Sequence, residues 1–122
     1  MDELIIKGQL SGLNDYTKAC RSNRYAGNQM KRNNQDHITI FIRNQLKGEH
    51  FERVAIRFNW FEPNRRRDPD NICFAKKFIL DAMVSEGVIK NDTQRYIDHF
   101  EDHFYIDEQN PRIEVWLTEI ED

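Results

Sequence analysis

Residues 65–92 decide the fold, and they read RRRDPDNICFAKKFILDAMVSEGVIKND. Asp68 followed by Pro69 is typical of a helix start, because a carboxylate can cap free N–H groups and proline suits the first helical position. Apolar residues then cover most of the helix circumference, and Gly87 is typical of a helix end. We therefore expect a helix over residues 69–86 that is covered on more than one side.

The same stretch contains the side chains of a metal site. Asp68 and Asp70 flank one proline, and two carboxylates this close raise each other's pKa unless a cation lies between them. Mg²⁺ prefers a few carboxylates plus water, and it can activate water for attack on a phosphodiester. The alternative is that both aspartates only stabilise the helix start, which the DPDN string alone favours.

Basic side chains surround this pair of aspartates. Three consecutive arginines precede it: Arg65, Arg66 and Arg67. Arginine binds phosphate through paired hydrogen bonds, so we expect all three to contact a nucleic acid. At about 100° per residue, Lys77 lies within about 20° of Asp70, whereas Lys76 points about 120° away. Lys77 is our candidate for a cation that offsets transition-state charge, and a surface ion pair with Asp81 is the alternative.

Three motifs carry a resemblance to a known family. They are RRRDPDN (65–71), ILDAMVSEGVIKND (79–92) and PRIEVWLTEIE (111–121). Together they resemble the RusA family of Holliday junction resolvases, including the versions carried by phages and prophages, over most of the chain from Asn14 onward. The resemblance implies a homodimer and three aspartates that bind Mg²⁺, which fall here on Asp68, Asp70 and Asp92.

The resemblance also implies a catalytic lysine. When the helices are aligned on Asp81 and Ala82, the family's lysine matches Lys77. The best-known pattern places this lysine four residues after the second aspartate, whereas Lys77 follows Asp70 by seven. Both spacings keep one helix face, but the extra turn changes the reach by roughly 5 Å. The sequence therefore leaves Lys76 and Lys77 as alternatives for this role.

Length and charge indicate a single domain whose first part, up to Arg67, is basic and whose remainder is acidic. The 122 residues suffice for one domain, 1–122, with a modest core. The net charge of −3 divides into 13 lysines and arginines against 7 acids up to Arg67, and 5 against 14 after it. A basic half can face phosphates while acids gather at a metal, although a solvated helix face is the alternative. The predicted DNA-binding residues besides the three arginines are Lys76, Arg21, Arg24, Lys31 and Arg32.

Other side chains exclude several classes of site. Cys20 and Cys73 form no CxxC or finger spacing, so neither a disulfide framework nor structural zinc is indicated. On a strand, His99 and His103 would share a face about 13 Å apart, too far for one ion. No apolar run approaches membrane-spanning length, and the first residues lack a signal-peptide pattern, so we expect a cytoplasmic protein.

Periodicity and turn residues give the remaining elements. Strands are expected at residues 4–10, 54–61, 96–106 and 112–120, with the last two joined as a hairpin. Gly27 and the Asn33-Asn34 pair make an unbroken helix doubtful, so an irregular basic segment should precede a helix ending near Gly48. The predicted fold class is α+β, RusA-like: a small mixed β-sheet of about four strands with two main helices, in β-α-β-α-β-β order.

The leading hypothesis is an enzyme. It is a Mg²⁺-dependent, structure-selective endodeoxyribonuclease, with Mn²⁺ able to substitute, that resolves four-way DNA junctions in recombination and repair. A homodimer would make the paired symmetric nicks, and the apolar helix over residues 69–86 offers more apolar surface than one small sheet can cover. The alternatives are a non-catalytic nucleic-acid-binding module and a subunit-interaction protein that uses the same helix.

Overall fold

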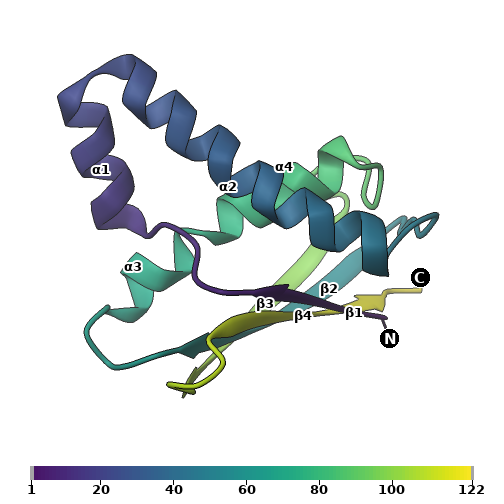
Figure 1. Ribbon diagram of the computed structural model, residues 1–122. Helices are drawn as coiled ribbons and strands as arrows, with labels where there is room; N and C mark the ends of the chain where they lie inside the picture. Colours follow the sequence, from purple (N-terminus) through teal and green to yellow (C-terminus); the bar gives the residue numbers. More distant parts are fainter. Residues whose placement is uncertain (1, 122) are drawn as a thin grey trace.

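The computed structural model describes residues 2–121 and has two layers (Figure 1). One layer is a sheet of β1 (Asp2–Lys7), β2 (Val54–Glu62), β3 (Ile97–Ile106) and β4 (Arg112–Glu119). The helices lie on one side of it and comprise α1 (Leu13–Ser22), α2 (Arg24–Gln45), α3 (Pro69–Cys73) and α4 (Lys76–Ser85). The prediction of an α+β fold with a four-stranded mixed sheet is confirmed, with four helical segments in place of two main helices.

The strand order of the sheet is β1-β4-β2-β3. β2 and β3 are parallel, and α3 and α4 form the crossover that this direction requires. β4 is antiparallel to both β1 and β2, so the predicted hairpin between residues 96–106 and 112–120 is wrong. Residues 107–111 instead cross the end of β2, where the N–H of Asp107 donates to the carbonyl of Glu62 at 2.8 Å.

Burial explains which strands became central. β2 is buried at alternate positions from Val54 to Trp60 and also at Asn59, and Phe58 stacks on Trp60 with ring centroids 5.5 Å apart. A strand this apolar needs a neighbour on each side, which β3 and β4 supply. β3 is exposed along most of its length and lies at an edge. A five-residue connection can reach the next strand or the one beyond it, so its length could not distinguish the two arrangements.

The basic segment before β2 is helical rather than irregular, which corrects the prediction. Its break falls at Asn23, between α1 and α2. Asn23 has extended backbone angles, and its side chain accepts a hydrogen bond from the N–H of Ala26 at 2.7 Å. It therefore acts as the N-cap of α2, a role for which asparagine is well suited.

The residues that made an unbroken helix doubtful have long-range roles inside α2. A Cβ atom at Gly27 would lie 2.6 Å from Sγ of Cys20, so glycine permits the close approach of α1 and α2. Asn34 is buried, and its amide bonds to the N–H and hydroxyl of Ser11 and to the carbonyl of Met30. Both residues serve tertiary contacts, which outweigh their low helix propensity.

The helix predicted over residues 69–86 is divided between α3 and α4. The N–H of Ala75 donates to the carbonyl of Ile72 at 3.2 Å, and that of Lys77 donates to Phe74 at 3.1 Å. These bonds span three residues, as in a 3₁₀ turn, which winds the chain more tightly than an α-helix. A uniform helical wheel therefore does not relate Lys77 to Asp70, and contacts must decide which lysine faces the site.

The argument that α4 needs a second subunit as cover is also wrong. Phe78, Ile79, Leu80, Ala82 and Met83 of α4 are all buried by the chain itself. The sheet covers one side of this helix, and α2 packs along another. No helix among residues 2–121 is long and apolar enough to cross a membrane. The cytoplasmic location stays a prediction.

Candidate functional site

The two aspartates of the DPDN motif lie at the junction between β2 and α3. Asp68 occupies the N-cap position with extended backbone angles, and Pro69 starts the helix. Its carboxylate nevertheless makes no capping hydrogen bond, and both Asp68 and Asp70 are exposed. Within residues 2–121 neither carboxylate forms an ion pair with a basic side chain. Both carboxylates are therefore available for an external cation. A role in capping the helix alone does not explain why Asp68 makes no capping hydrogen bond.

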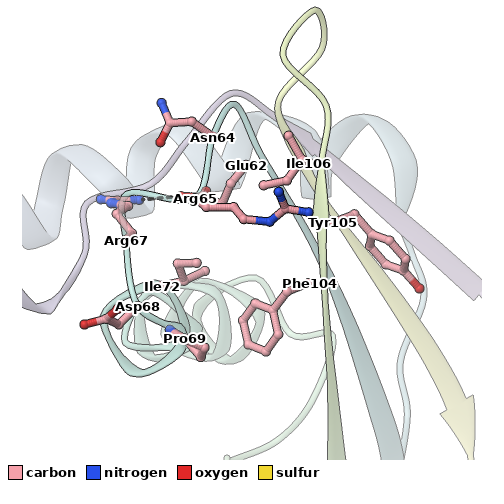
Figure 2. A pocket seen from close by; sticks show the side chains of 10 residues that line it. All are labelled: Glu62, Asn64, Arg65, Arg67, Asp68, Pro69, Ile72, Phe104, Tyr105 and Ile106. Atoms are coloured by element: carbon pink, nitrogen blue, oxygen red, sulfur yellow. Dashed lines mark ion pairs between the residues drawn. The ribbon is translucent and has the colours of Figure 1, made fainter.

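Arg67 fixes the loop that carries these aspartates. Its guanidinium lies 2.9 Å from Oδ2 of Asp15 and donates to the carbonyl of Leu10 at 3.0 Å. A third contact, 3.5 Å to Oε1 of Glu62, is drawn in Figure 2. The N–H of Gly12 and then Arg67 lower the pKa of Asp15. These contacts inside the chain give Arg67 a role in positioning the loop, and its predicted contact with DNA stays a prediction.

A second contact joins the start of α1 to α3. Oδ1 of Asn71 accepts a hydrogen bond from the N–H of Asn14 at 2.9 Å. Gly12 lies so close that an added Cβ would meet Oδ1 of Asn71 at 2.5 Å and its carbonyl at 2.9 Å. The first turn of α3 is thus held from two sides, which limits the positions that Asp68 and Asp70 can take.

Asp92 lies beside Lys77 and belongs to the loop that follows α4. Nζ of Lys77 is 3.6 Å from Oδ2 of Asp92 and 3.1 Å from Oδ1 of Asp81. The hydrogen bond with Asp81 is the main cause of a raised pKa for Lys77, and Asp92 adds to it. Lys31 approaches Oδ2 of Asp81 at 3.5 Å. The predicted ion pair of Lys77 with Asp81 is confirmed, and it coexists with the contact to Asp92.

Lys76 has a different environment. Its ammonium lies 2.8 Å from Oδ2 of Asp102 and above the ring of Phe100, with 4.5 Å to the centroid. Oδ1 of Asp102 also accepts a hydrogen bond from Nε1 of Trp60 at 2.9 Å. Lys76 thereby fastens α4 to β3, and it is less exposed than Lys77. Of the two lysines, the geometry leaves Lys77 available for a substrate.

The residues predicted to bind Mg²⁺ are only partly grouped. Asp68 lines a pocket beside β3, whereas Asp92 lines a different hollow with Lys77 and Asp81. Among residues 2–121, no three His, Cys, Asp or Glu side chains are close enough to hold a metal. Asp68 and Asp70 still fit Mg²⁺, which often takes one or two carboxylates and completes its shell with water and phosphate. The convergence of all three aspartates stays a prediction.

The pocket beside Asp68 has a volume of about 610 Å³. Figure 2 shows Arg65 extended across it toward Ile106, while Asp68 points outward on the opposite side. Glu62 is 6% exposed and accepts a hydrogen bond from Nε2 of Gln9 at 3.1 Å. The lining residues are Glu62, Asn64, Arg65, Arg67, Asp68, Pro69, Ile72, Phe104, Tyr105 and Ile106. Arg65 is therefore placed to bind an anion inside this pocket.

The remaining predicted DNA-binding residues lie on the helical side. They are Arg66 in the loop, Arg21 in α1, and Arg24, Lys31 and Arg32 in α2, and all are exposed. Sequence reasoning assigned no role to Glu62, Asn71 or Asp102. Asn71 stands inside the DPDN motif, which was a usable signal, whereas the partners of Glu62 and Asp102 are distant in the chain.

Comparison with protein families and with curated proteins finds no relative. No protein-family model matches the chain, and no curated protein matches it. Function must therefore be argued from the residues and their geometry.

Proposed function

We propose that the chain is a Mg²⁺-dependent, structure-selective endodeoxyribonuclease that resolves four-way DNA junctions in recombination and repair. One observation carries the proposal: Asp68 and Asp70 lie at a braced strand-to-helix junction, and their exposed carboxylates form no ion pair within residues 2–121. A helix start needs no such pair, whereas a phosphodiesterase needs rigid oxygen ligands. The resemblance of the surrounding motif to the RusA family supports the same activity.

Asp68 and Asp70 would hold the metal, with Asp92 as the third ligand that the resemblance implies. Bound Mg²⁺ supplies a Lewis acid for the phosphodiester and lowers the pKa of a water nucleophile, and Mn²⁺ can supply the same chemistry. The chain's own contribution is rigidity. Arg67 and Asn71 fix the loop and the first helical turn, which carry both carboxylates.

Basic side chains bind and orient the DNA in this proposal. Arg65 and Arg66 bind phosphates next to the aspartates, because their guanidinium groups suit paired phosphate oxygens. Lys77 offsets negative charge on the reacting phosphate, and Asp81 holds its ammonium in place. The wider surface that receives the junction arms consists of Arg21, Arg24, Lys31 and Arg32. A homodimer presents two such sites to the two-fold symmetric junction, which allows paired nicks.

The test is cleavage of a synthetic four-way junction by the purified protein, with and without Mg²⁺. We expect two symmetric nicks with Mg²⁺, none with EDTA, and much slower cleavage of a linear duplex of the same sequence. Metal-independent cleavage, or equal cleavage of linear duplex, contradicts the proposal. The ungrouped position of Asp92 favours one alternative, a non-catalytic nucleic-acid-binding module. That module would bind the junction and leave it uncut in either metal.

A further inference from the structure

The two edge strands of the sheet, β1 and β3, differ in how side chains cover their backbone groups. Along β1, the side-chain amide of Gln45 bonds to both the N–H and the carbonyl of Ile5, at 2.7 and 2.8 Å. His37 contacts the carbonyl of Lys7 at 2.8 Å. Along β3, no side chain within residues 2–121 bonds to the backbone of the strand. A ten-residue strand left open in this way is a template for pairing with another chain.

The outward-facing groups of β3 can be identified from its bonds to β2. Asp107 faces β2, because its N–H donates to the carbonyl of Glu62. Backbone direction alternates along a strand, so alternate residues before Asp107 present their N–H and C=O to solvent. These residues are Phe100, Asp102, Phe104 and Ile106. Phe100, Phe104 and Ile106 are also 40, 41 and 46% exposed, so the open edge carries apolar side chains as well.

We propose that two copies of this chain pair antiparallel through β3, with the two-fold axis at Asp102. This register sets Phe100 of one copy against Phe104 of the other, on the side of the helices. On the opposite side it sets Glu101 against His103, which places opposite charges together when the histidine is protonated. The two sheets then form one continuous eight-stranded sheet.

Neighbouring registers are less complementary. An axis at Glu101 sets two Glu101 side chains against each other and His99 against His103. An axis at His103 sets two His103 side chains together and leaves Glu101 opposite Tyr105. Like charges directly opposite each other destabilise a strand pair. Both neighbouring registers contain such a pair and lack the pairing of Glu101 with His103.

The axis at Asp102 also brings two carboxylates together, but each is already neutralised inside its own chain. Lys76 lies 2.8 Å from one oxygen, and Nε1 of Trp60 donates to the other at 2.9 Å. A carboxylate with both a cation and a hydrogen-bond donor repels a second carboxylate weakly. The partly buried Lys76 therefore makes this register tolerable.

The pairing supplies the interface of the proposed nuclease dimer and rests on that part of the proposed function alone. It replaces α4, which the chain covers itself, as the contact surface. Pairing through β3 requires neither metal nor cleavage, so the proposed pairing and the proposed nuclease activity can fail separately.

Cysteine cross-linking tests the register. In a background of Cys20→Ser, the double variant Glu101→Cys/His103→Cys places thiols at non-hydrogen-bonded cross-strand positions, where Cα atoms lie about 4.5 Å apart and a disulfide fits. We expect a covalent dimer after mild oxidation. The control His99→Cys/Glu101→Cys belongs to another register and should cross-link at least tenfold more slowly. Equal cross-linking of both variants, or of neither, overturns the register.

Sedimentation of the unmodified protein at micromolar concentration tests the surface. We expect twice the mass of one 14.7 kDa chain. Phe104→Lys should shift the protein to a monomer with an unchanged circular dichroism spectrum. Ile40→Lys replaces a more exposed apolar side chain on α2, 59% accessible, and should stay dimeric. A monomeric parent protein, or a dimer that survives Phe104→Lys, overturns the pairing. Junction cleavage by such a protein would still support the nuclease.

Discussion

The ammonium of Lys77 lies 3.6 Å from a carboxylate oxygen of Asp92, which the loop after α4 brings back against the helix. The contact joins two residues of the motif that sequence spacing alone could not relate. It also separates the roles of the adjacent lysines, because Lys76 is directed toward β3 instead.

Replacing these lysines separately should affect different properties. Lys77→Met should slow junction cleavage on the order of 10²-fold with little change in stability, because it removes one electrostatic contact with the transition state. Lys76→Met should lower the free energy of unfolding by about 1–3 kcal/mol, because Asp102 loses its charged partner. Urea unfolding and single-turnover cleavage measure the two effects. The assignment fails if Lys76→Met is the slow but stable variant.

Asp70→Asn should abolish cleavage and leave junction binding intact or tighter. The substitution removes a metal ligand and also one negative charge near the DNA phosphates. Gel-shift and nicking assays at equal ionic strength give the two measurements. Asp36→Asn is the matched control, since Asp36 is an exposed carboxylate on α2, away from the motif. Wild-type cleavage by Asp70→Asn would show that the metal assignment is wrong.

Gly12→Ala should destabilise the protein and disturb the site together. The new Cβ would lie 2.5 Å from Oδ1 and 2.9 Å from the backbone carbonyl of Asn71, so the start of α3 must move. Overpacking of this kind costs about 1–3 kcal/mol. Thermal unfolding measures the loss, and Ser22→Ala, at the exposed end of α1, should be nearly neutral. An unchanged melting temperature for Gly12→Ala would contradict the close packing.

The two cysteines should differ in reactivity. Burial, followed by the charge of Asp102, raises the pKa of Cys73 from 9.0 to about 11. The thiolate is the reactive form, so at pH 8 an alkylating agent should modify the exposed Cys20 first, as mass spectrometry of peptides would show. Because the folded state holds the Cys73 proton more tightly, its contribution to stability is present below pH 9 and lost as the pH rises toward 11. Cys73→Ala should reduce this alkaline loss.

Local patterns predicted the strands well, and long-range contacts decided the rest. The alternation over residues 54–61 gave β2 within one residue of its end, because period-2 burial is a local property. The neighbours of β3 depend on which strand most needs cover, which no local pattern contains. Likewise, the string of three arginines looks uniform, yet only Arg67 has Asp15 and Glu62 within reach.

At the candidate site, too, local patterns predicted some features and long-range contacts decided others. The motif supplied Asp68, Asp70 and Lys77 as candidates, but the 3₁₀ turn after α3 removed the regular spacing that the helical wheel assumed. Asn71 and Gly12 act through a contact between segments far apart in the sequence, so their role became visible only in three dimensions.

The pairing of β1 with β4 has a consequence for synthesis on the ribosome. Of the strands in this sheet β1 emerges first, but its strand partner β4 spans Arg112–Glu119 and emerges after β2 and β3. β2 likewise waits for both of its neighbours, so the sheet cannot close before residues 112–119 have left the ribosome. Contacts this distant in sequence slow folding and lengthen the time that apolar strands stay uncovered. A nascent chain stopped before Arg112 would therefore be a substrate for chaperones and proteases rather than a partly folded domain.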